Sequence, residues 1–116
     1  MKKTGGLTTK QAAESFEVLM PLLKSLYNEF KDLSKKNPES AVSKGKVALV
    51  NRLLEKVRGI LSDQDSLPFL DLLNDDDLPQ SSDVTIMLSQ YVAAMTAFKY
   101  RYFGWDGTEE GWYIKK

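Results

Sequence analysis

Hydrophobic side chains in the first third of the chain recur at alternating spacings of four and three residues, the period of one face of an α-helix. Thr8, followed three residues later by Gln11, has the spacing of a capping box. Pro21 lacks the N–H that a helix interior needs, but the period continues in phase across it, so we expect a kink and not an end. The pattern therefore predicts a helix near residues 10–35. Its apolar positions are Ala12, Phe16, Leu19, Leu23, Leu26, Phe30 and Leu33.

A second amphipathic helix is predicted near residues 38–62. Asn37 followed by Pro38 has the form of an N-cap with proline at the first helical position. Ser43 is the alternative start, because Gly45 weakens the first turns. The apolar stripe consists of Val42, Leu49, Val50, Leu53, Leu54, Val57, Ile60 and Leu61, and the remaining surface is basic.

A third helix is predicted near residues 82–103, after a short helix over 66–73 and an acidic connector. Ser81 or Ser82 is the expected N-cap and Gly104 the expected C-terminal stop. The apolar steps again alternate between four and three, at Val84, Leu88, Tyr91, Met95, Phe98 and Tyr102.

The C-terminal segment, residues 104–116, has turn chemistry at Asp106-Gly107 between aromatic residues, which favours a docked tail or a small hairpin. The fold class predicted is all-α: a bundle of three main helices with a short extra helix and this aromatic tail or hairpin. We expect one domain over residues 1–116, with a flexible N-terminus at 1–8. The predicted core is Phe16, Leu23, Phe30, Leu53, Val57, Leu88, Tyr91, Met95 and Phe98.

The chain contains neither histidine nor cysteine, which narrows the chemistry open to it. Disulfide frameworks, thiolate zinc sites, cysteine nucleophiles and Ser-His-Asp relays are excluded. Glycine-rich phosphate-binding loops and the G-x-S-x-G motif are missing as well, so we predict no cofactor.

Two features of the sequence bear on location. The basic start Met1-Lys2-Lys3 is followed by a polar segment, where an export signal would have an apolar one. The longest apolar run, Tyr91–Met95, has five residues and is too short to cross a bilayer. We expect a cytoplasmic protein that does not enter a membrane.

Charge is balanced overall but uneven along the chain. Residues 1–60 carry 12 basic and 6 acidic side chains, whereas residues 61–116 carry 4 basic and 10 acidic ones. Either the two halves neutralise each other within one molecule, or a charged surface faces a partner. Residues 99–105 interleave cations and aromatics as a base-stacking platform does. Nucleic acid is still an unexpected partner, because the chain has no basic excess and Tyr102 belongs to the core stripe.

Two pairs of acidic residues stand at helical spacing in the first predicted helix. Glu14-Ser-Phe-Glu17 and Glu29-Phe-Lys-Asp32 form an E-x-x-E and an E-x-x-D. This pattern resembles the magnesium-binding signature of the all-α nucleoside-triphosphate pyrophosphohydrolases, and the resemblance implies four carboxylates on facing helices around Mg²⁺. Both pairs here fall on one predicted helix, with Glu14 and Glu29 about 22 Å apart along it. We therefore favour a solvated acidic face and keep a small Mg-dependent phosphohydrolase as the alternative function.

A second acidic stretch contains Asp63, Asp65, Asp71 and Asp75–Asp77. Its oxygen ligands suit a hard cation, but its spacing lacks the glycine and the twelfth-position glutamate of an EF-hand loop. We favour a solvated connector or one that faces the basic second helix.

Apolar side chains outside the main stripes predict a surface for another protein. Three stripes this wide carry more apolar area than a three-helix core of this size hides, and methionine and aromatic side chains rimmed by charge are typical of interface cores. We expect a non-catalytic interaction module that self-associates or binds a protein ligand, for example as the small regulatory or inhibitory partner of a larger bacterial enzyme. The alternative is that the tail and residues 66–73 cover these side chains. The candidate interface residues are Met20, Leu22, Tyr27, Phe69, Trp105 and Trp112.

Overall fold

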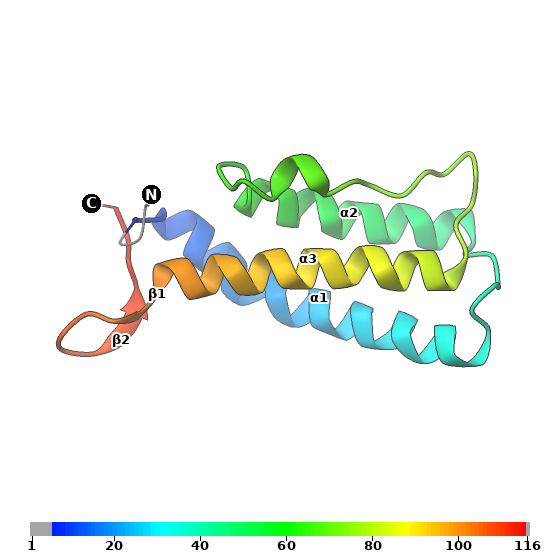
Figure 1. The fold of residues 1–116 in the computed structure, drawn as a ribbon. Coiled ribbons are helices and arrows are strands. Elements are labelled where there is room, and N and C mark those ends of the chain that lie inside the picture. Colours follow the sequence, from blue (N-terminus) through cyan, green and yellow to red (C-terminus); the bar gives the residue numbers. More distant parts are fainter. Residues whose placement is uncertain (1–5, 116) are drawn as a thin grey trace.

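The chain is mostly helical, as expected, and ends in a small antiparallel hairpin (Figure 1). The structure, a computed structural model, describes residues 6–115. It consists of three α-helices, one short 3-10 helix and two strands: α1 Lys10–Lys36, α2 Lys44–Ile60, η1 Leu67–Phe69, α3 Ser81–Tyr102, β1 Phe103–Trp105 and β2 Glu110–Trp112.

Helix α1 begins one residue later than the capping box suggested. The Thr9 hydroxyl, not that of Thr8, accepts a hydrogen bond from the Ala12 N–H at 3.0 Å. Thr8 is buried and pairs with the C-terminal segment: its N–H donates to the Tyr113 carbonyl, and its carbonyl accepts from the Lys115 N–H. A local pattern cannot show which of two adjacent threonines is the N-cap, because that depends on the contact of Thr8 with the distant C-terminal segment. Residues 1–5 of the predicted flexible N-terminus lie outside the described part of the chain.

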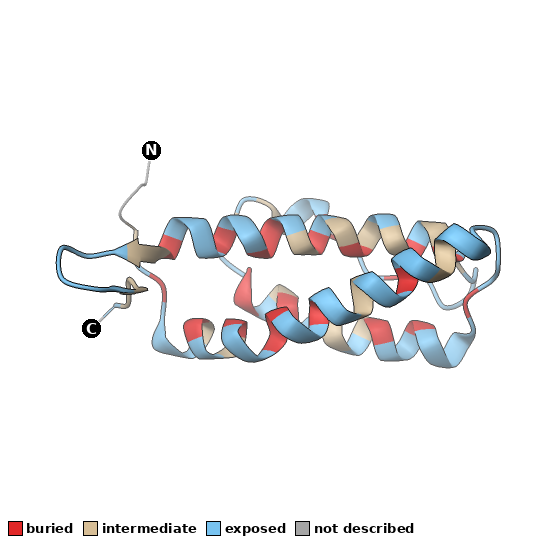
Figure 2. Cartoon of the chain, turned by 90° about the horizontal axis from the view of Figure 1, so that it is seen from below, coloured by how far each residue is buried: buried red, intermediate tan, exposed pale blue. Residues whose placement is uncertain are grey.

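Helix α1 continues through Pro21 to Lys36, so the prediction that the proline does not end the helix is confirmed. Pro21 itself is exposed. In Figure 2, α1 runs as one long helix obliquely across the view, past the nearly horizontal α3.

Helix α2 begins after Ser43, whose hydroxyl accepts from the Lys46 N–H, so the predicted start at Asn37-Pro38 is wrong and the alternative start is correct. The segment before it pairs with the residues that precede α3 instead of forming helical hydrogen bonds. The Val42 N–H donates to the Pro79 carbonyl, and the Ser81 hydroxyl donates to the Asn37 carbonyl. Because the Ser81 hydroxyl bonds to Asn37, the N-cap of α3 is Gln80 and not Ser81 or Ser82. The Asp83 carboxylate accepts a hydrogen bond from the Gln80 N–H.

The connector between α2 and α3 is held by side-chain hydrogen bonds to its backbone. The expected helix over 66–73 shrinks to the single 3-10 turn of η1. Asn51 forms two bonds of 2.8 Å with the backbone of Leu73, the Tyr91 hydroxyl donates to the Asp71 carbonyl at 2.8 Å, and Arg58 donates to the Leu70 carbonyl. These partners satisfy carbonyls and N–H groups that a helix would have paired internally.

The predicted hairpin is present, with Gly104 paired to Gly111. Gly104 is not the helix stop that the sequence suggested: α3 ends at Tyr102, and Gly104 lies in β1. A Cβ at this position would clash with the Tyr113 hydroxyl, so the position favours glycine. At the turn, Gly107 has a φ of 102°, which favours glycine. Trp112 docks the hairpin on the helices, with its ring 5.1 Å from that of Phe16.

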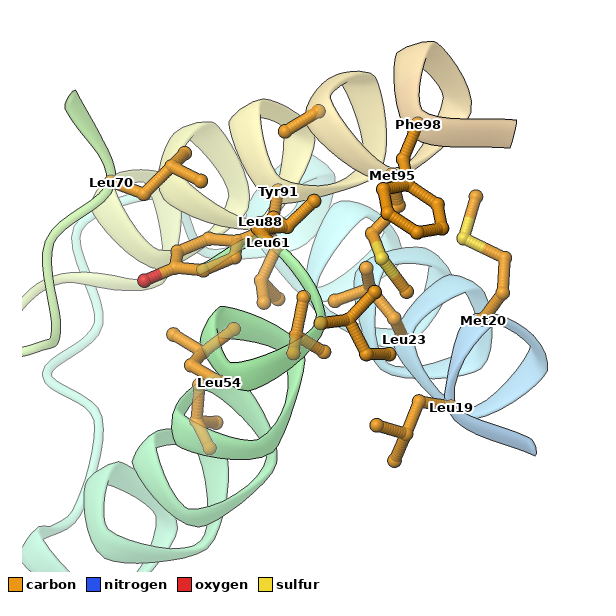
Figure 3. Close-up of a cluster of buried hydrophobic side chains, with 14 of the residues drawn as sticks. Leu19, Met20, Leu23, Leu54, Leu61, Leu70, Leu88, Tyr91, Met95 and Phe98 are labelled. Carbon is orange, nitrogen blue, oxygen red and sulfur yellow. The ribbon is translucent and has the colours of Figure 1, made fainter. Parts of the chain in front are cut away.

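The core runs along the inside of all three helices (Figure 3). Eight of the nine predicted core residues are buried, and the ninth, Leu53, is half-buried. The connector adds Leu70 and Leu73 to this cluster. The molecule measures 49 × 24 × 23 Å, so it is about twice as long as it is wide. Within the described residues, no helix has the length and apolar character that crossing a bilayer requires.

Candidate functional site

The three helices differ in how their shared faces are covered. Helix α1 packs directly along α3, where the rings of Phe16 and Phe98 lie 5.9 Å apart and the hydroxyls of Ser34 and Thr85 form a hydrogen bond. The connector bonds to both α2 and α3, through Asn51 and Tyr91, and so covers the side that these helices share. The side shared by α1 and α2 is hollowed along its length. This open side is the candidate site.

We call this surface the α1–α2 groove. It consists of three hollows of about 730, 320 and 260 Å³. The first two share Leu19 and Lys56, and the second and third share Leu26 and Leu49, so they form one continuous depression. From Thr9 to Leu33 it follows α1 for about 36 Å at 1.5 Å per residue.

Three large aliphatic side chains in the groove are exposed to solvent. Val18 is 64%, Leu22 52% and Leu49 59% exposed. Val18 and Leu22 lie one turn apart on α1, and Leu49 lies on α2 beside the half-buried Leu53. Isolated exposed leucines are ordinary, but exposed apolar side chains gathered between two helices are a feature that surfaces for other molecules often have.

The two rims of the groove carry opposite charges. Glu14 and Glu29 lie on the α1 rim, whereas Lys46, Arg52 and Lys56 lie on the α2 rim. The helices are antiparallel, so Glu14 shares a hollow with Lys56 at one end and Glu29 shares a hollow with Lys46 at the other. The charged residues that line each rim therefore all have one sign, acidic on α1 and basic on α2.

The groove overlaps the sequence-predicted interface only at Leu22. Met20 is buried in the core at 7% exposure, and Trp112 is half-buried against Phe16. Tyr27 is half-buried, with the Lys31 ammonium 5.8 Å from its ring.

Phe69 and Trp105 are exposed, but they lie in η1 and β1 respectively and do not line the groove. Val18 and Leu49, which do line it, are absent from the predicted set. Helical spacing places Val18 one turn before Leu22 and Leu49 one turn before Leu53. Spacing alone does not show that these positions stay exposed, because Leu49 and Leu53 belong to the stripe that predicted the core.

The four carboxylates of the alternative metal site all lie on α1, and all four are exposed. Glu14, Glu17, Glu29 and Asp32 do not meet residues of a facing helix as the pyrophosphohydrolase pattern requires. Among residues 6–115, no group of three or more carboxylates is gathered so that it could hold a metal ion, which also applies to the acidic stretch at 63–77.

Among residues 6–115, two titratable groups have shifted pKa values, and neither lines the groove. Burial raises the pKa of the Tyr91 hydroxyl, and the nearby Arg58 guanidinium opposes this shift. Hydrogen bonds from the backbone N–H groups of Glu109 and Thr108 lower the pKa of the Asp106 carboxyl. Both shifts follow from structural contacts, of the connector and of the hairpin turn.

The cation–aromatic segment at 99–105 is divided between surface and core. Tyr102 is buried, and its ring lies 5.0 Å from that of Phe98. The Lys99 ammonium lies 4.6 Å from the Phe103 ring, which in turn packs on Trp112. Tyr102 and Phe103 therefore pack within the molecule, whereas Tyr100 and Trp105 are 89% and 63% exposed.

Comparison of the chain with protein-family models, with curated proteins and with solved structures gave no significant match. The function is therefore argued from the groove itself.

Proposed function

We propose that this chain is a three-helix bundle that acts as a non-catalytic protein–protein interaction module. An amphipathic helix of a partner protein binds in its α1–α2 groove. The observation that carries the proposal is the continuous apolar strip of Val18, Leu22 and Leu49 between two antiparallel helices. A small regulatory or inhibitory partner of a larger enzyme would use a surface of this kind.

The shape of the groove favours a helix over a small molecule. The volume of its largest hollow lies within the usual range for small-ligand sites, but the three hollows together form a long depression. Its apolar side chains repeat at one-turn spacing on both walls. A helix with apolar residues at i, i+3/i+4 and i+7 presents ridges that match such a groove.

The apolar strip is large enough to contribute to affinity. Full burial of an aliphatic side chain stabilises by about 1.5–3 kcal/mol, and each of the three exposed side chains would realise part of that on binding. Association costs about 4–15 kcal/mol in lost freedom, so contacts along much of the groove are needed. The half-buried Leu26 and Leu53 on the groove floor supply such contacts.

A designed peptide tests this proposal. The probe is a fluorescein-labelled helix of three heptads, with leucine at the a and d positions and mixed glutamate and lysine at the flanking positions. We expect saturable binding by fluorescence anisotropy. The double variant Val18→Glu/Leu22→Glu should weaken binding at least tenfold, or about 1.4 kcal/mol, because it puts charges into the apolar strip.

Ile86→Glu is the control variant. Ile86 is 60% exposed on α3 and does not line the groove, so this substitution should leave the affinity for the peptide unchanged. Equal binding by the double variant and the wild type would place the peptide elsewhere and refute the proposal.

A further inference from the structure

We infer that the partner in the α1–α2 groove is a second copy of this chain, docked groove to groove about a twofold axis parallel to the helices. This inference rests on the proposed function, because it assigns the protein that binds the same surface. In the dimer, α1 of each copy lies over α2 of the other, and the apolar side chains of the two grooves face each other. The inference is carried by the sign and position of the rim charges, which make the groove complementary to itself.

A twofold axis parallel to the helices places α1 of each copy over α2 of the other at the same height along the groove. Glu14 then faces Lys56 of the second copy. Glu29 faces Lys46 and Arg52 of the second copy, since these residues share its hollows within one chain. Opposite charges therefore alternate around both ends of the dimer.

The other face-to-face arrangement is disfavoured by the same charges. A twofold axis perpendicular to the helices lays α1 over α1 and α2 over α2. The acidic rim with Glu14 and Glu29 would then face a second acidic rim, and the basic rim of α2 would face a second basic rim. Like charges across an interface suppress association, so the rim pattern selects the parallel axis.

The apolar residues complete the arrangement. Each copy contributes Val18, Leu22, Leu49 and Leu53 between the charged ends of the groove. The four helices that meet, two from each copy, have antiparallel neighbours on all sides, which is an ordinary arrangement for a four-helix core. The dimer would thus bury the aliphatic side chains that the single chain leaves in water.

The size of the surface is adequate for a stable pair. A strip about 36 Å long and two helices wide, at about 10 Å per helix, covers roughly 700 Å² on each copy. Stable protein interfaces bury about 800 Å² per partner, so the groove approaches that size.

Two charge-reversed chains test the inference. The first, Glu14→Lys/Glu29→Lys, has two basic rims, and the second, Lys46→Glu/Arg52→Glu/Lys56→Glu, has two acidic rims. In sedimentation velocity, each chain alone should dimerise at least tenfold more weakly than the wild type. An equimolar mixture of the two should form a one-to-one heterodimer.

Controls carry equal charge changes outside the groove. Glu17→Lys/Glu55→Lys matches the first chain, and Lys35→Glu/Lys44→Glu/Lys115→Glu matches the second, all at exposed positions that do not line the three hollows. Both should dimerise within about threefold of the wild type, or within about 0.65 kcal/mol. Combining all five groove substitutions in one chain should restore homodimerisation, which also shows that the reversed residues are compatible with folding.

A wild-type chain that stays monomeric at all accessible concentrations would overturn the inference, and so would reversed chains that dimerise as strongly as the wild type. The designed peptide keeps the two proposals apart. If the peptide still binds and Val18→Glu/Leu22→Glu abolishes this binding, the groove takes the helix of a different protein and only the dimer is refuted. If neither the peptide nor a second copy occupies the groove, both proposals fail.

Discussion

Tyr91 shows how one residue links the helices to the connector. Its ring is completely buried in the core, whereas its hydroxyl reaches the edge of the core and donates to the Asp71 carbonyl at 2.8 Å. Burial raises the pKa of this hydroxyl above its ordinary value of 10.0, because the phenolate is poorly solvated there. The unfolded chain therefore releases this proton at a lower pH than the folded chain does.

The pH dependence of Tyr91→Phe follows from that difference. With a raised folded pKa, the stability contributed by the protonated tyrosine is fully present below pH 10 and is lost as the pH rises through the folded pKa. We expect the variant to lose about 0.5–1.5 kcal/mol at neutral pH, for one hydrogen bond, but to show a smaller further loss above pH 10. Urea unfolding at neutral and alkaline pH measures both quantities. Parallel losses in variant and wild type would contradict this assignment.

At the scale of elements, the connector between α2 and α3 has little secondary structure but a defined path. Leu70 and Leu73 are buried, and the Asn51 side chain forms two hydrogen bonds with the backbone of Leu73. The acidic residues that follow, Asp75–Asp77, are exposed. The connector thus acts as a strap whose apolar side chains and backbone bonds, and not its charges, attach it to the helices.

Asn51→Ala should loosen this strap without unfolding the helices. It removes two hydrogen bonds and leaves the Leu73 N–H and carbonyl without their partners, which should cost about 1–3 kcal/mol. Hydrogen exchange at the Leu73 amide should accelerate, whereas exchange within α1 should change less. The exposed Asn28→Ala on α1 is the control, with no expected effect at Leu73. Unchanged protection of the Leu73 amide would show that its burial, and not Asn51, holds the strap.

At the scale of the whole molecule, the elongated three-helix arrangement leaves the α1–α2 side uncovered along its length. A separate hollow of about 350 Å³ lies between α1, α3 and β1. The hairpin docks near one end of α1 and α3 through Trp112, and the connector lies against α2 and α3. Neither the hairpin nor the connector contributes a lining residue to the two groove hollows of about 320 and 260 Å³. The apolar strip is therefore a property of the assembled fold.

A protein that buries this strip by pairing should have a thermal midpoint that depends on its own concentration. Association of the folded state alone stabilises that state by mass action, so we expect the Tm to rise by a few degrees over a roughly hundredfold increase in concentration. The Val18→Glu/Leu22→Glu variant puts charges into the strip and should not dimerise, so its Tm should be constant over the same range. Differential scanning calorimetry measures both. A constant wild-type Tm would argue against association in the folded state.

The sequence by itself determined the helical class, the approximate position of each helix and nearly all of the core. Periodicity suffices there because a helix must place its apolar side chains on one side, at spacings of three and four, wherever that side packs. Phe16, Leu88 and Met95 are buried for this reason. The hairpin was also predictable, since Asp106-Gly107 meets a local requirement of the turn.

Only the tertiary structure decided the features that depend on distant partners. Helix α2 begins after Ser43 and not after Asn37 as predicted, because residues 79–81 form hydrogen bonds with the backbone between these two positions. Met20 is buried in the core and Leu22 is exposed, although both are apolar. The position of α3 determines which side of α1 is covered. The open groove was likewise undetermined by local pattern: periodicity gives the direction of a helix face, whereas its exposure depends on which other elements pack against it.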